Sequence, residues 1–155
     1  MKKLPLEKIK VELLPVTGEI RSQVEALELG SSQTDLVASN TDSLLEADED
    51  ANAKPRAIFV AGTLVGFLMY DATSETGVAQ LYRFMIDKSF QGLGYGKAAL
   101  QAVLAEIETL GHVHQISICY EPENFAARQL YAKAGFVEDA VDEDGEMIAY
   151  LNLEG

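Results

Sequence analysis

Two hydrophobic periodicities alternate along the chain and predict a mixed α/β fold. Runs rich in β-branched residues or alternating in polarity predict strands at residues 9–14, 57–60, 64–70, 78–86, 116–120 and 147–153, and leave room for one short strand near 136–141. Helical spacing predicts helices at residues 19–29, 42–50 and 97–110 and another after Asn124. The predicted order is β-α-α-β-β-β-α-β-α-β, which is an α/β class with a mixed sheet.

Polar caps and glycines set the expected ends of these helices. The apolar stripe of the third helix follows i, i+3, i+4, i+7 spacing and ends before Gly111: Leu100, Val103, Leu104 and Ile107. The fourth turns inward Ala127, Leu130, Tyr131 and Ala134 and ends at Gly135. Expected N-caps are Thr17, Asn40 or Thr41, and Asn124. Residues 30–33 should end the first helix, and residues 142–145 should form a hairpin turn.

A glycine-rich segment between a strand and a helix is the strongest candidate for chemistry. Residues 91–97 place glycines at alternate positions, which allows positive φ and close approach of the backbone to a ligand. Successive amides at a helix N-terminus can hold a pyrophosphate, although an ordinary strand-to-helix turn is the alternative. The spacing of a P-loop fails because Gln91 and Ala98 stand where Gly and Ser or Thr belong. The dinucleotide fingerprint fails because Lys97 replaces its third glycine.

Two motifs resemble those of the GNAT superfamily of acetyltransferases. Gln91-x-x-Gly94-x-Gly96 matches its Q/R-x-x-G-x-G/A signature, and residues 124–136 are similar to its N-x-x-A-x-x-L-Y-x-x-x-G-F helix. The resemblance covers most of the chain and is clearest over residues 57–136. It implies a single domain over residues 1–155, with a central, mostly antiparallel twisted sheet flanked by helices on both faces.

A finer resemblance indicates which kind of molecule would accept the acetyl group. Residues 32–33, 37–40, 43–47 and 64–70 are similar to bacterial spermidine and diamine acetyltransferases. This implies acetyl-CoA-dependent N-acetylation of a primary amine on a small cationic acceptor. Another amine (a protein N-terminus, an amino acid or an aminoglycoside) and a non-catalytic acyl-CoA-binding module are the alternatives.

The resemblance also assigns site residues. Those implied to bind acetyl-CoA are Phe84, Met85, Ile86, Gln91, Gly92, Leu93, Gly94, Tyr95, Gly96, Lys97, Asn124 and Tyr131. Tyr131 matches the general acid that protonates the leaving thiolate, and a phenol with a pKa of about 10 can donate to a thiolate with a pKa of about 8.5. Its residue type alone favours a core residue on an apolar helix face, and its place in the N-x-x-A-x-x-L-Y motif favours the role of general acid.

The general base is not evident from the motifs. No carboxylate lies between Gly77 and Ile86, where many relatives place one. An alkylammonium with a pKa of about 10.4 must still lose a proton. A remote carboxylate acting through water or capture of the neutral amine would serve, and the candidates Glu46, Asp71 and Glu75 cannot be ranked.

Composition narrows the partners. A net charge of −13 over 155 residues argues against nucleic acid and would concentrate a cationic small molecule, or would simply favour solubility. The chain shows neither the pattern of a signal peptide nor an apolar run long enough for a membrane span, and its single Cys119 excludes an internal disulfide, so we expect a cytoplasmic protein.

The remaining candidate residues give weaker signals: His112, His114 and Cys119 provide too few ligands for a metal, Lys97 contacts phosphate or only begins a helix, and Arg83 meets phosphate or an acidic neighbour. A homodimer is expected from the resemblance.

Overall fold

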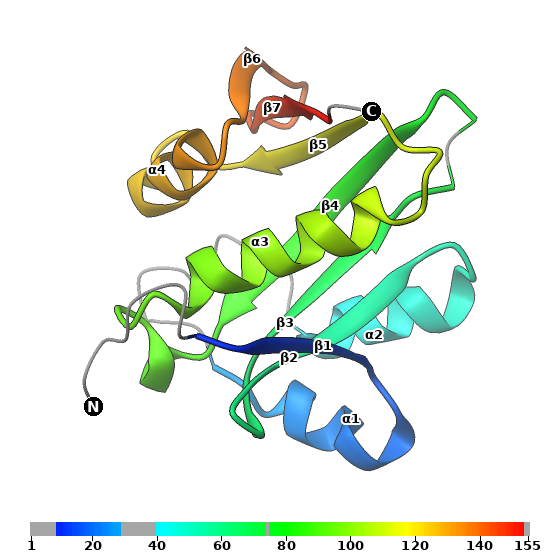
Figure 1. The fold of residues 1–155 in the computed structure, drawn as a ribbon, viewed down its shortest axis with the longest axis vertical. Coiled ribbons are helices and arrows are strands. Elements are labelled where there is room, and N and C mark those ends of the chain that lie inside the picture. Colours follow the sequence, from blue (N-terminus) through cyan, green and yellow to red (C-terminus); the bar gives the residue numbers. More distant parts are fainter. Residues whose placement is uncertain (1–8, 29–39, 74, 154–155) are drawn as a thin grey trace.

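The computed structural model describes residues 9–28, 40–73 and 75–153, which form a seven-stranded sheet with helices on both faces (Figure 1). The elements in chain order are β1 (Val11–Pro15), α1 (Gly18–Glu25), α2 (Asn40–Glu49), β2 (Lys54–Val60), β3 (Thr63–Asp71), β4 (Val78–Ile86), the 3-10 helix η2 (Lys88–Phe90), α3 (Tyr95–Glu108), β5 (Gln115–Tyr120), α4 (Phe125–Lys133), β6 (Val137–Val141) and β7 (Met147–Asn152).

The sheet has the strand order β1-β2-β3-β4-β5-β7-β6. Within the described ranges all neighbouring strands pair antiparallel except β4 and β5, which pair parallel. A parallel pair needs a crossover, and α3 provides it between these two strands. The prediction of a mostly antiparallel sheet is therefore confirmed, and the short strand for which the sequence left room is β6.

Two apolar cores lie on opposite faces of the sheet. On one face, Leu68 and Leu81 pack in one cluster with Leu100 and Val103 of α3. On the other, Phe67 of β3 packs with Val24 of α1 and Leu44 of α2. Neighbouring residues such as Phe67 and Leu68 face opposite cores because strand side chains alternate. Each such fully buried side chain contributes roughly 1.5–3 kcal/mol.

Element boundaries differ from the predictions where local chemistry overrides periodicity. The first strand begins at Val11 rather than residue 9, and it includes Pro15. Proline is tolerated here because β1 is an edge strand, whose outer side forms no hydrogen bonds with another strand. Helix α1 ends at Glu25, before the predicted residue 29. Helix α3 begins at Tyr95, two residues early, because Gly94 adopts a left-handed conformation at its N-cap. Two predictions lie outside the described residues. They are the helix break at residues 30–33 and the resemblance to spermidine and diamine acetyltransferases at residues 32–33 and 37–39.

Two of the three expected caps behave differently from the prediction. Asn124 caps α4 as expected, since its side chain accepts a hydrogen bond from Ala127 N. Thr17 occupies the N-cap position of α1 but makes no side-chain capping bond. Asn40 lies inside α2 and donates through Nδ2 to Val24 O, 2.8 Å away, so it ties α2 to α1. In the parts of the chain that the structure describes, no helix is long and apolar enough to cross a membrane.

Candidate active site

Strands β4 and β5 separate midway along their length, and this separation opens the site. Their parallel pairing joins Val78–Leu81 of β4 to Gln115–Ile118 of β5 and then stops. Beyond it, β4 continues to Ile86 and β5 to Tyr120 without pairing to each other. The far half of β4 therefore presents on this side backbone groups that its ladder with β5 does not use, and these can pair with an extended ligand.

A β-bulge shapes β4 at this point. Leu68 of β3 pairs with Phe84 and Tyr70 pairs with Leu81, so two residues of β4 stand opposite one of β3. One of the two is Arg83, whose φ of 139° is rare for a residue with a side chain and costs on the order of 1–3 kcal/mol. Surrounding contacts must hold such a conformation, which re-aims the strand just before the candidate residues 84–86.

Arg83 is held from the opposite face of the sheet. Its Nε donates to Ser43 Oγ at 3.0 Å, and its Nη2 lies 3.2 Å from Glu46 Oε2, both on helix α2. The guanidinium also lies over the Tyr82 ring, 5.4 Å from the centroid. Of the two roles that the sequence allowed for Arg83, pairing with an acidic neighbour is therefore confirmed. The contact also takes Glu46, one of the candidate bases, as its partner.

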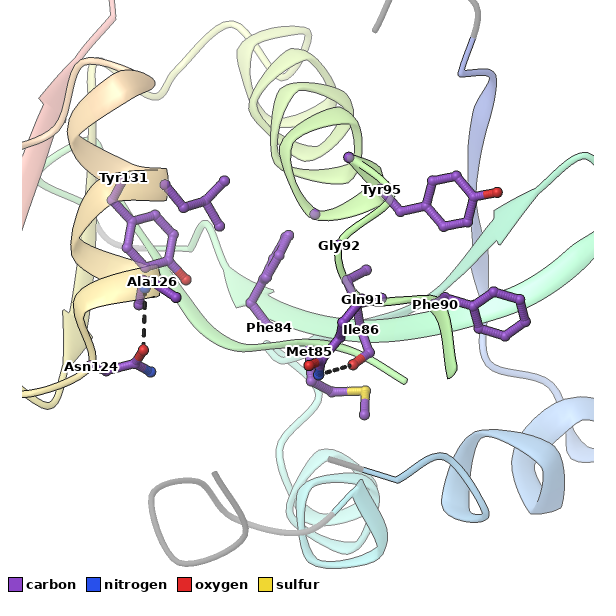
Figure 2. Close-up of a pocket in the computed structure, with 14 residues that line it drawn as sticks. Phe84, Met85, Ile86, Phe90, Gln91, Gly92, Tyr95, Asn124, Ala126 and Tyr131 are labelled. Atoms are coloured by element: carbon purple, nitrogen blue, oxygen red, sulfur yellow. Dashed lines mark hydrogen bonds between the residues drawn. The ribbon is translucent and has the colours of Figure 1, made fainter. Parts of the chain in front are cut away.

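One cavity, which we call the cofactor groove, has a volume of about 370 Å³ and lies where β4, the glycine segment and α4 meet (Figure 2). Ten of the twelve predicted cofactor residues line it: Phe84, Met85, Ile86, Gln91, Gly92, Gly94, Tyr95, Gly96, Asn124 and Tyr131. Leu93 and Lys97 lie outside its lining. Sequence reasoning missed four further lining residues, Phe90, Ala126, Ala127 and Leu130. Of these, only Ala127 and Leu130 had a signal, namely their place on the inner face of the predicted helix.

The glycine segment has the geometry of an anion site. Gly92 and Gly94 have φ of 81° and 87°, as expected, but Gly96 has no positive φ because it belongs to the first turn of α3. The first helical hydrogen bond runs from Ala98 N to Gly94 O, so the amides of Gly96 and Lys97 have no acceptor within the helix. These donors and the positive end of the helix dipole favour a phosphate.

The side chain of Gln91 closes this segment onto β4. Its Nε2 donates to the carbonyl oxygen of Ile86 at 2.9 Å, drawn as a dashed line in Figure 2. The hydrogen bond joins the glycine segment to the end of the strand that lines the same groove. Gln91 therefore positions the loop, a role that its place in the sequence motif did not indicate.

Tyr131 lies at the wall of the groove with its ring fixed on two sides. Its ring stacks on Tyr120 at a centroid distance of 5.5 Å and meets Phe136 edge-on at 5.7 Å. Only 8% of its surface is exposed, yet its hydroxyl makes no hydrogen bond to any residue in the described ranges. Figure 2 shows the hydroxyl pointing from α4 into the space between α4 and β4. Burial raises the pKa of the phenol well above its usual value, so the group stays protonated.

A polar network supports the Tyr131 ring from behind. The Tyr120 hydroxyl donates to Glu138 Oε2 at 2.7 Å, and Arg128 reaches both oxygens of the same carboxylate at 3.0 Å. This network fixes the ring on which Tyr131 stacks. Its members come from β5, α4 and β6, so no single sequence motif contains it.

The second cavity, which we call the acidic cavity, has a volume of about 600 Å³ and adjoins the cofactor groove. The two share four lining residues: Phe84, Asn124, Ala127 and Tyr131. Four carboxylates line the acidic cavity, namely Glu121, Asp142, Asp144 and Glu146. Sequence reasoning identified none of them, because a turn and a loop bring them together from separate parts of the chain.

The bases suggested by the sequence lie elsewhere. Glu46, Asp71 and Glu75 line neither cavity. Glu46 pairs with Arg83, and Asp71 Oδ1 accepts a hydrogen bond from Thr73 N at 2.8 Å.

The histidines have structural contacts. His112 and His114 place Nε2 2.7 Å from the carbonyl oxygens of Ala72 and Thr76. Among the described residues no group of three or more His, Cys, Asp or Glu side chains could hold a metal ion.

Comparison with known proteins identifies the family. Residues 24–136 match the Acetyltransferase (GNAT) family. The chain is 30% identical over 152 residues to a "Probable spermine N(1)-acetyltransferase" of Bacillus subtilis subsp. natto (strain BEST195), covering 94% of this chain and 100% of the relative. It is 29% identical, with the same coverage, to a spermine/spermidine N(1)-acetyltransferase of Bacillus subtilis (strain 168).

Solved structures share the fold at lower identity. An aminoglycoside acetyltransferase in complex with coenzyme A aligns with a TM-score of 0.78 at 16% identity, over 92% of this chain and 95% of that one. A Salmonella typhimurium acetyltransferase that modifies the N-terminal serine of ribosomal protein L7/L12 aligns with a TM-score of 0.76 at 17% identity, over 97% and 98%. The family match spans more than half of the sequence and includes both motifs, so the chain belongs to the GNAT family of acetyltransferases.

Proposed function

We propose that this protein transfers the acetyl group of acetyl-CoA to a primary amine of a small polycation, a polyamine or diamine of the spermidine type. The observation that supports this most is the junction of the two cavities. A groove with an anion-binding helix N-terminus meets a cavity lined by four carboxylates, and Tyr131 and Phe84 belong to both. An acyl donor in the first and a cationic amine in the second would meet beside Tyr131.

The cofactor groove fits acetyl-CoA. The amides at the start of α3 suit a pyrophosphate, and the unpaired edge of β4 at residues 84–86 suits the amides of the pantetheine arm. The apolar part of the lining, which includes Phe84 and Leu130, suits its methylene groups. Acetyl-CoA supplies the acetyl group as a thioester. The chain orients this donor, and Tyr131 keeps a proton beside the junction.

The acidic cavity favours a cationic acceptor. Four carboxylates in one cavity repel one another, and a ligand with positive charges relieves that repulsion. The net charge of −13 also raises the local concentration of cations around the protein. This enrichment becomes smaller as the ionic strength increases. Arg83 also lines this cavity but is paired with Glu46, so the four carboxylates favour a cationic acceptor over a neutral or anionic one.

The alternatives differ in how they fit. The aminoglycoside acceptor of one structural neighbour is also polycationic, whereas the N-terminal serine of another offers a single amine. The polyamine reading is favoured because the two Bacillus relatives, whose names specify spermine or spermidine, align over 94% of this chain. A binding module without chemistry would have no need of the Tyr131 hydroxyl, which lies at the junction of the two cavities without a hydrogen-bond partner among the described residues.

The test is acceptor-dependent release of coenzyme A thiol across a panel of spermine, spermidine, putrescine, an aminoglycoside and a serine-terminated peptide. We expect the polyamines to give kcat/KM at least tenfold above the aminoglycoside and the peptide. Acetyl-CoA alone measures background hydrolysis. A preference for the peptide, or tight acetyl-CoA binding with no acceptor-dependent release, would contradict the proposal.

A further inference from the structure

The four carboxylates of the acidic cavity differ in their hydrogen bonds and in their exposure to solvent. Asp142 Oδ1 accepts hydrogen bonds from the amides of Asp144 and Glu146, both at 2.9 Å, so this carboxylate is used to shape the hairpin turn. Asp144 is exposed to solvent. Glu121 and Glu146 are partly buried, and neither side chain has a hydrogen bond or ion pair with another described residue.

Glu146 stands out from these by its surroundings. The charged groups around it are Asp142 and Asp144 of its own turn, Glu121 from the loop between β5 and α4, and Arg83 from β4. Burial, followed by the three negative neighbours, raises the pKa of the Glu146 carboxyl, and Arg83 opposes this only in part. A carboxylate with a raised pKa is a better proton acceptor at neutral pH.

A second observation places the reacting centre in the same cavity. Tyr131 is more than nine-tenths buried, its hydroxyl has no partner among the described residues, and it lines the acidic cavity as well as the groove. Because Glu146 and Tyr131 line one cavity, both side chains are available to a small amine bound there. Strand β4 supplies no carboxylate for the first of these contacts.

Resting on the proposed function, we infer that Glu146 is the general base, which takes the proton from the acceptor ammonium, while Glu121 and Asp144 hold the other charged nitrogens of the polycation. Glu146 is then a catalytic residue from the β6–β7 connection. The hairpin turn that Asp142 shapes orients its side chain towards the amine.

The proton balance closes with the groups present. The ammonium gives one proton to the Glu146 carboxylate, and the freed lone pair forms the nitrogen–carbon bond as the carbon–sulfur bond breaks. Tyr131 gives its proton to the sulfur and regains one from the acylated nitrogen. Glu146 releases its proton to solvent. The ammonium thus loses two protons, one to solvent and one to the thiol, and nothing is oxidised or reduced.

The test compares Glu146→Gln with Glu143→Gln. Glu143 lies on the same turn but does not line the cavity, so the control removes one charge of the same kind without the proposed base. For Glu146→Gln we expect kcat/KM with spermidine to fall about 1000-fold at pH 7 while acetyl-CoA affinity by calorimetry stays within twofold. For Glu143→Gln we expect both within twofold of the parent.

The pH profile separates base catalysis from simple charge attraction. The parent enzyme should show a plateau in kcat/KM between the pKa of Glu146 and that of the ammonium, at about 10. Glu146→Gln should lose the plateau and rise about tenfold per pH unit, approaching the parent only as the pH reaches the pKa of the amine, at about 10.4, where half of it is neutral. Glu121→Gln and Asp144→Asn should raise the KM for spermidine and keep the plateau.

An active enzyme whose Glu146→Gln variant keeps the plateau and the parent kcat would overturn this role and leave the proposed function standing. A plateau lost in Glu121→Gln instead would assign the base to Glu121. A parent that binds acetyl-CoA and releases no thiol with any amine would contradict the proposed function, and the role of Glu146 with it.

Discussion

Arg83 Nη2 lies 3.2 Å from Glu46 Oε2, and this ion pair joins helix α2 to the bulged segment of β4. Residues 84–86, which line the cofactor groove, follow directly. The backbone that would face the thioester is thus held by a side chain that reaches to the other face of the sheet. Substitutions on α2 should therefore change the position of residues 84–86 in the cofactor groove.

Two substitutions of Arg83 distinguish the effect of its side-chain contacts from the effect of its strained backbone. Both Arg83→Ala and Arg83→Gly remove the contacts to Ser43 and Glu46, but only glycine adopts a φ of 139° without a steric cost. We expect Arg83→Gly to be at least as stable as Arg83→Ala in urea denaturation, with both below the parent in kcat. If Arg83→Ala were more stable than Arg83→Gly by about 1 kcal/mol, the strain at this bulge would be refuted.

Two glycines of one motif should respond differently to alanine. Gly94 has a φ of 87°, so Gly94→Ala forces a strained backbone at the start of α3, at a cost of about 1–3 kcal/mol. A Cβ at Gly96 would meet only Ile86 Cγ1, at an ordinary distance of 3.8 Å. Calorimetry with coenzyme A should show affinity at least tenfold weaker for Gly94→Ala and nearly unchanged for Gly96→Ala. Equal losses would mean that the amide geometry described for this segment is wrong.

Tyr131→Phe should lower turnover about 100-fold while leaving acetyl-CoA affinity and stability nearly unchanged, because the hydroxyl makes no hydrogen bond to the described residues. Burial raises the pKa of this phenol, so the parent profile should show no loss of activity from Tyr131 ionisation below about pH 10. The control is Tyr120→Phe, which keeps the stacked ring and loses only the bond to Glu138. Full turnover in Tyr131→Phe would remove the residue from the chemistry.

Gly66 tests the packing beneath the site. A Cβ there would run into the carbonyl oxygen of Met85, which belongs to the groove-lining part of β4. We expect Gly66→Ala to destabilise the protein by about 1–3 kcal/mol and to weaken coenzyme A binding, because β4 must shift. Gly18→Ala, with nothing within 4 Å of its Cβ, is the matched control and should unfold like the parent. A stable Gly66→Ala with full affinity would contradict the close approach of β3 and β4.

The cofactor side of the site was predictable from the sequence because its parts are local. The glycine segment, its strand and its helix are contiguous, so the resemblance of this one stretch to the GNAT motif assigned most of the groove-lining residues. Helix α3 still began early, because the left-handed Gly94 starts the helix where periodicity showed only a loop. The Arg83 bulge had no signal, since positive φ is not a preference of arginine.

The acceptor side was not predictable because its parts are distant in sequence. Glu121 follows β5, whereas Asp142, Asp144 and Glu146 lie on the hairpin between β6 and β7. Only the pairing of β5 with β7 brings the two segments to one cavity. In the sequence these acids look like an ordinary solvated turn, and the search for a base near β4 therefore led to Glu46, Asp71 and Glu75, which line neither cavity.

The most direct test is product analysis after incubation of the protein with acetyl-CoA and spermidine. The account predicts spermidine carrying one acetyl group on a primary amine, formed in equal amount to free coenzyme A thiol and nearly lost in Tyr131→Phe. Unmodified spermidine alongside intact acetyl-CoA, under conditions where calorimetry shows both bound, would contradict it.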